Sequence, residues 1–169
     1  MATEPAQPAP DNSTAEPAKP DTWQPFTSAN GRFSVLFPSP PQQLKEPPES
    51  HVHGFSSSAD KGHTVYVVEY TDLRPDFGPE AVPQAILGIE EKIEIGDGLL
   101  INDKIIDLHG VPGRAFETVD PSGDSGFVRE FFTWPCLYTV MVVAQKGYTA
   151  THADQFMNSF IILGNPPRP

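Results

Sequence analysis

Positive charge is scarce in this chain. Its 169 residues contain 11 Lys and Arg against 22 Asp and Glu, which gives a net charge of -11 at pH 7. Nucleic acids and anionic lipid headgroups are bound mainly through Lys and Arg. The acidic balance therefore predicts no nucleic-acid partner and no direct docking on anionic lipid.

Cysteine and long apolar runs are also lacking. Cys136 is the single cysteine, so it cannot form a disulfide within the chain, and its apolar flanks predict an inert buried thiol. No apolar stretch approaches the roughly 20 residues that a membrane-spanning helix needs. A glycine-rich phosphate loop, a dinucleotide fingerprint and a zinc-protease motif are absent as well. We therefore expect a protein that is not an enzyme.

Proline, by contrast, is abundant, with 20 residues. Residues 1–22 combine it with Ala, Asp, Glu, Ser and Thr, a composition that predicts a disordered Pro/Ala-rich acidic tail. Such a tail can tether a domain to a lipid-modified cysteine or follow a cleaved signal, in which case Met1-Ala2 replaces the natural N-terminus. The alternative is a cytoplasmic protein with a flexible end. We expect a single domain over 23–165 and a short tail over 166–169.

The folded part reads mostly as strands. In 32–37, Phe33, Val35 and Phe37 alternate with Arg32, Ser34 and Leu36, the pattern of a strand with one buried face, and Pro38 ends it. Runs rich in β-branched and aromatic residues predict further strands. They cover 52–57, 63–70, 100–108, 114–119, 127–133 and 137–144. The last four form two antiparallel hairpins, joined by 109–113 and 134–136.

Two segments have helical spacing instead. Val82, Ile86, Ile89 and Ile93 recur with the helical period over 79–95. The second helix covers 150–160, where Thr151 and Asp154 form a weak capping box. Its apolar stripe consists of Ala153, Phe156, Met157 and Phe160.

The run 137–144 is apolar on both faces, so it must be a central strand that is covered on both sides. The predicted fold class is therefore α+β, an antiparallel sheet of about six strands with a helix against each face.

Four short motifs resemble the PsbP-like superfamily, the extrinsic lumenal proteins of photosystem II and their bacterial relatives. They are Phe-Ser-Val-Leu-Phe-Pro at 33–38, the amphipathic helix after the third strand, Leu137-Tyr138, and Phe156-x-x-Ser159-Phe160. The resemblance covers about 23–163 and implies an α/β/α sandwich. It also implies export to the thylakoid lumen or periplasm, often as a lipoprotein, and a non-enzymatic role as an accessory or assembly factor.

From this resemblance we expect a monomer that docks on a membrane-anchored protein complex, with a photosystem as the related example. The membrane itself would be reached only through an N-terminal lipid anchor. The basic surface that plant members use for docking has no counterpart in this acidic chain. The loops around 71–79 and 109–114 are the expected contact regions, because such loops are exposed and tolerate variation.

Two alternatives remain open. His51 and His53 are two residues apart, so in an extended strand both imidazoles would lie on one face and could share a zinc ion with a third ligand. His63, His109 and His152 are the candidates for that ligand, and the competing interpretation is solvated surface histidines. A small-molecule or metal site would then occupy a pocket between helix and sheet.

The other alternative is a cryptic hydrolase. Gly123-Asp124-Ser125-Gly126 matches the nucleophile loop of trypsin-like proteases, but Phe127 replaces the next glycine and no histidine segment of that family occurs upstream. Residues 120–126 are better interpreted as a hairpin loop of turn-forming residues. A histidine within hydrogen-bond reach of Ser125 would distinguish the two.

Overall fold

Most of the chain forms a layered β structure. The computed structural model describes residues 22–47, 49–73, 78 and 98–164. The predicted helix over 79–95 and nearly all of the predicted tail lie outside these residues. No helix in the described segments is long and apolar enough to cross a membrane.

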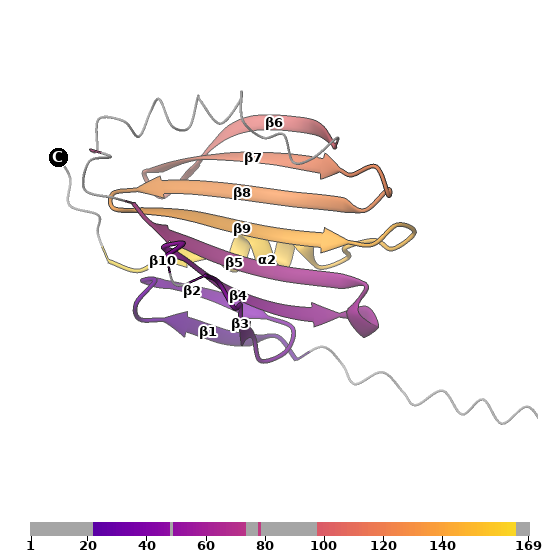
Figure 1. Cartoon of the computed structure of the whole chain (residues 1–169), viewed down its shortest axis with the longest axis horizontal. Coiled ribbons are helices and arrows are strands. Elements are labelled where there is room, and N and C mark those ends of the chain that lie inside the picture. Colours follow the sequence, from indigo (N-terminus) through magenta and orange to yellow (C-terminus); the bar gives the residue numbers. More distant parts are fainter. Residues whose placement is uncertain (1–21, 48, 74–77, 79–97, 165–169) are drawn as a thin grey trace, which may run out of the picture.

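The main sheet has seven antiparallel strands, where about six were predicted, in the order β3-β4-β5-β9-β8-β7-β6 (Figure 1). The additional strand β3 is only two residues long. A short 3-10 helix, Asp60–Gly62, joins β4 to β5. The strands are β3 (Gln42–Gln43), β4 (Val52–Ala59), β5 (Thr64–Asp72), β6 (Leu99–Leu108), β7 (Val111–Val119), β8 (Ser125–Thr133) and β9 (Cys136–Ala144).

A second, smaller sheet lies on one face of the main sheet. It contains β1 (Gln24–Ser28), β2 (Phe33–Phe37) and β10 (Ile161–Ile162) in the order β1-β2-β10. The helix α2 (Ala153–Ser159) packs on the same side and contacts β2 and β9. The first predicted strand therefore belongs to this covering layer and not to the main sheet. We call the covered side of the main sheet the core face and the opposite side the outer face.

Aromatic rings fill the space between the two layers. Phe33 and Phe37 are fully buried, as their alternation predicted. Phe156 of α2 lies 5.3 Å from Phe37 and 5.2 Å from Tyr66, measured between ring centroids. The strand and helix patterns together predict a core of twelve residues, and the ten of them that the structure describes are buried: Phe33, Val35, Phe37, Tyr66, Val68, Tyr138, Val140, Val142, Phe156 and Phe160. The other two, Ile86 and Ile89, lie outside the described residues.

The central position of β9 is confirmed, because it is the fourth of seven strands. Its core-face residues are buried and its outer-face residues are half-buried. Burial of the neighbouring outer-face residues Val67, Val128 and Phe132 shows that this side is also covered. The described residues contain one α-helix, so helices on both faces are not established by them.

Two local predictions were wrong. The helix begins at Ala153 and not near Ala150, and its N-cap His152 makes no side-chain capping bond, so the capping box does not form. Instead the backbone N–H of Ala153 donates to the carbonyl of Ala150, which closes a turn before the helix. The apolar stripe of the helix is buried as predicted.

The connection between β6 and β7 is also shorter than predicted. It contains only His109 and Gly110, with φ of 52° and 90°, so the rest of the predicted loop belongs to β7. A turn with both central residues at positive φ matches the twist of the two strands. Pro112 is tolerated in β7 because β8 pairing begins only at Gly113.

Candidate functional site

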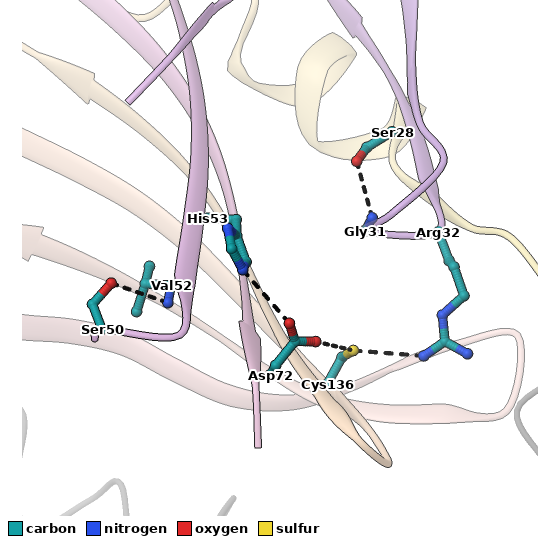
Figure 2. A network of polar contacts seen from close by, with 8 residues as sticks. All are labelled: Ser28, Gly31, Arg32, Ser50, Val52, His53, Asp72 and Cys136. Atoms are coloured by element: carbon teal, nitrogen blue, oxygen red, sulfur yellow. Dashed lines mark hydrogen bonds and ion pairs between the residues drawn. The ribbon is translucent and has the colours of Figure 1, made fainter. Parts of the chain in front are cut away.

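A chain of polar side chains joins the two layers at the end of the main sheet where β5 ends and β9 begins (Figure 2). His53 Nε2 lies 3.6 Å from Asp72 Oδ2. Cys136 Sγ donates to Asp72 Oδ1 at 3.6 Å and accepts from Arg32 Nη2 at 3.5 Å. We call these four residues the end network. It connects the β1–β2 turn to three strands that are distant in the sequence.

Cys136, the centre of the end network, has a structural role. Cys136 is 2% exposed, which confirms the prediction of a buried thiol. The hydrogen bond from Arg32 to Cys136 raises the pKa of that guanidinium. Beside it, the buried Tyr138 hydroxyl donates to the carbonyl of Gly31 at 2.9 Å, and burial raises the Tyr138 pKa. The thiol is therefore a packed partner and not an accessible nucleophile.

The predicted metal pair is arranged differently from the extended strand that suggested it. His51 precedes β4 with a left-handed φ of 54°, so the two imidazoles are not successive residues on one strand face. His53 is on β4, where its ring stacks on Tyr70 at 4.7 Å. Both histidines nevertheless border the same shallow hollow of about 260 Å³, together with Lys45 and Glu46.

The three candidate third ligands lie elsewhere. His63 stacks on Tyr148 and bonds to Gln145 beyond the opposite end of β4 and β5. His109 forms the β6–β7 turn, and His152 packs on Trp23. Among the described residues, no group of three His, Cys, Asp or Glu side chains is placed to hold a metal ion.

The Ser125 segment forms the β7–β8 connection, as its turn-forming residues predicted. Asp120 Oδ1 accepts hydrogen bonds from Ser122 Oγ and from the backbone N–H groups of Gly123 and Asp124. These bonds lower the pKa of Asp120. Ser125 itself begins β8 opposite Ala144. In the described segments no histidine is hydrogen-bonded to Ser125.

A groove with a volume of about 360 Å³ lies beside α2, and we call it the α2 groove. It lies on the core face, over the half of the main sheet that the small sheet leaves open. A pocket between helix and sheet was one expectation, but the alternation of strand residues did not indicate where it would lie. Its lining includes Lys104, Ile106, Ala115, Phe127, Arg129, Phe131, Asp154 and Met157.

Small residues on β7 make the α2 groove. Ala115 pairs with Lys104 on one side and with Arg129 on the other. Gly113, one pair further along the same face, carries no side chain at all and lies against the Phe131 ring. Two long neighbours flanking a short residue leave a depression in the sheet surface.

Two arginines on neighbouring strands have opposite surroundings. On the outer face, Arg114 is 3% exposed and donates two hydrogen bonds to Asp103, at 2.7 Å and 2.8 Å. These bonds lower the Asp103 pKa, while burial raises the pKa of the adjacent Glu130. On the core face, Arg129 donates to a neutral partner, Asn158 Oδ1, at 2.9 Å, and burial lowers its pKa.

A bulge in β6 places the partner of Arg114. The register shifts between Ile101 and Lys104, and Asn102 has a φ of 55°. The extra residue lets Asp103 reach Arg114 while Asn102 donates to Glu117 at 3.0 Å. Asn tolerates this left-handed backbone better than most residues, and Asn102 is the only feature of the sequence that could have indicated the bulge.

Comparisons with known proteins support the fold described above. The chain is similar to the solution structure of cyanobacterial PsbP (CyanoP) from Synechocystis sp. PCC 6803, with a TM-score of 0.61 and 14% sequence identity. The match covers 89% of this chain and 98% of that chain. No family model matches the chain, and no curated protein matches it.

A crystal structure from Bacteroides thetaiotaomicron VPI-5482 is also similar, with a TM-score of 0.54 and 12% identity. The match covers 85% of this chain but only 49% of that chain. Identities this low show a shared fold and no more. The predicted PsbP-like fold relationship is confirmed.

Proposed function

Because the chain has a PsbP-like fold, we propose that it is a non-catalytic accessory or assembly protein that docks on a membrane-anchored protein complex. The observation that carries this proposal is the similarity to cyanobacterial PsbP over nearly the whole of both chains. The related complex would be a photosystem. The proposed compartment is the thylakoid lumen or periplasm, with the segment before Trp23 serving as a tether.

The strand β6 is the best candidate for the docking surface. Four of the seven large apolar residues that are exposed in the described segments lie on it: Leu99, Leu100, Ile101 and Ile105. Within those segments β6 pairs only with β7, so it is an edge strand of the main sheet. Proteins usually blunt such an edge, and an exposed apolar edge typically marks an interaction site.

The end of β5 and the β6–β7 turn, which belong to the two predicted contact regions, lie at one end of this sheet, whereas residues 74–77 and 79 lie outside the described residues. The strand β5 ends at Asp72 and the β6–β7 turn contains His109, and alternation of antiparallel strands places both at the same end. The chain carries a net charge of -11, so an acidic partner would be repelled. We expect the partner to present an apolar surface with basic residues at its rim.

Co-purification from detergent-solubilised membranes of the source organism tests the proposal. The tagged parent protein should recover a membrane complex, more of it at low salt than at high salt, because salt screens the attraction. Ile105→Asp should abolish recovery, since it places a charge in the apolar edge. Tyr148→Asp is the matched control, because Tyr148 is exposed and packs on His63 at the β5 side of the sheet.

Two results would contradict the proposal. Recovery of free monomer alone at both salt concentrations, with an unaltered membrane phenotype on deletion, would exclude docking on a complex. Equal recovery with Ile105→Asp and with the parent protein would show that the docking surface does not include this part of β6.

A further inference from the structure

We infer that the α2 groove binds a small amphipathic carboxylate, whose head group lies between Lys104 and Arg129 and whose apolar body lies on Phe127, Phe131 and Met157. This ligand site is independent of docking at β6.

The register places two cations on either side of an alanine. Lys104, Ala115 and Arg129 are directly opposed residues on β6, β7 and β8, so all three lie on the core face. Neighbouring strands are about 4.8 Å apart, which separates the two cationic residues by about 10 Å at the backbone. Both side chains are long enough to reach a common group above the short Ala115 side chain.

Arg129 has donors to spare for an anion. A guanidinium has five N–H donors in a planar fork that fits a carboxylate. Asn158 takes one of them, and no ion pair within 4 Å joins Arg129 to an acid among the described residues. Asp154 is near enough to favour the charged form, but burial is the larger influence and lowers the Arg129 pKa. A bound carboxylate would offset this loss of hydration.

Arg114 shows what the same side chain does when a carboxylate is available. It is nearly inaccessible, and its two hydrogen bonds to Asp103 form the bidentate arrangement typical of such pairs. Arg129 lies on the next strand and on the opposite face, and it borders the α2 groove instead of a carboxylate. The ligand would give Arg129 a carboxylate partner, as the β6 bulge gives Arg114 the carboxylate of Asp103.

The remaining lining selects the kind of anion. Phe127, Phe131, Met157 and Ile106 supply the apolar wall, and a volume of about 360 Å³ is at the small end of the range for ligand sites. Asp107, Glu117 and Asp154 also line the groove, so three acidic side chains face the two cations Lys104 and Arg129. A multiply charged phosphate would be repelled by these acids. A single carboxylate with an alkyl or aromatic body fits both the pair of cations and the apolar wall.

Titration of the full-length protein with decanoate, followed by amide chemical shifts, tests the inference. Decanol is the neutral control, because it has the same alkyl body without the charge. We expect decanoate to bind at least about tenfold more tightly than decanol, which corresponds to about 1.4 kcal/mol. The amides that shift should be those of β6 to β8 around Ala115 and those of α2.

Variants then assign the binding to the two cations. Arg129→Met should weaken decanoate binding about tenfold and leave decanol binding unchanged, and Lys104→Met should weaken it by a smaller factor. Lys146→Met is the matched control, because Lys146 is exposed in the turn after β9, and it should have no effect. Equal binding of decanoate and decanol to the parent protein would overturn the inference without any variant. Shifts outside the groove, or an absence of shifts at millimolar decanoate, would overturn it as well.

Discussion

Replacing Phe156 by alanine tests how the covering layer is held on the main sheet. The Phe156 side chain is fully buried between Phe37 of the small sheet and Tyr66 of the main sheet. Removing a buried ring loses a transfer free energy of about 2–3 kcal/mol. A residual cavity of about 80 Å³ would add about 2 kcal/mol, at roughly 24 cal/mol per Å³. Phe156→Ala should therefore lower the free energy of unfolding by about 4–5 kcal/mol, which lies within the range of about 3–5 kcal/mol for buried Phe truncations.

Urea denaturation followed by far-UV circular dichroism measures this loss directly. Trp23 packs edge-on against Tyr66, so its fluorescence gives a second signal from the same region. Gln155→Ala is the matched control, because Gln155 is exposed on the same helix, and it should change stability by less than about 0.5 kcal/mol. A loss below about 1 kcal/mol for Phe156→Ala would mean that α2 does not pack on the sheet as described.

Three further predictions concern other parts of the molecule. Gly113→Ala should destabilise the protein by about 1–3 kcal/mol in the same denaturation assay, because its Cβ would collide with the Glu130 carbonyl and approach Phe131 Cδ1 to 2.6 Å. Glu130→Gln should stabilise the protein more at pH 7 than at pH 4. Burial raises the Glu130 pKa in the folded state, so the parent protein loses stability as the pH rises through that pKa, and the Gln variant does not. Urea titrations at the two pH values measure this difference, and an equal effect of the substitution at both would contradict the prediction. Any zinc affinity should disappear in calorimetry of the His51→Ala, His53→Ala double variant, whereas unchanged affinity would place the site elsewhere.

Much of the fold could be predicted from local patterns. The alternation of Phe33, Val35 and Phe37 identified a buried strand face, and the doubly apolar run 137–144 identified the central strand β9. Both succeed because the period of side chains along a strand follows directly from backbone geometry. The same reasoning could not assign β2 to a separate sheet, because a strand has the same alternation in either layer.

The candidate site was harder to predict. The His51–His53 spacing suggested a shared strand face. His51 has a left-handed backbone and precedes β4, so the two histidines do not lie on one strand face. The α2 groove has no local signal, since it depends on which residues of β6 and β8 lie beside Ala115. Strand register across three strands is a long-range property, and a shift by one residue would move every side chain to the other face.

Local patterns in the sequence establish the strand-rich class, the buried faces of the strands and the apolar stripe of α2, because each depends on residues within a few positions of one another. Tertiary structure decided the order of the strands, the separate small sheet and the contrasting surroundings of Arg114 and Arg129. These features depend on pairing between segments that are distant in the chain. The bulge at Asn102 gives one arginine a carboxylate, and the face assigned by register leaves the other arginine beside an open groove.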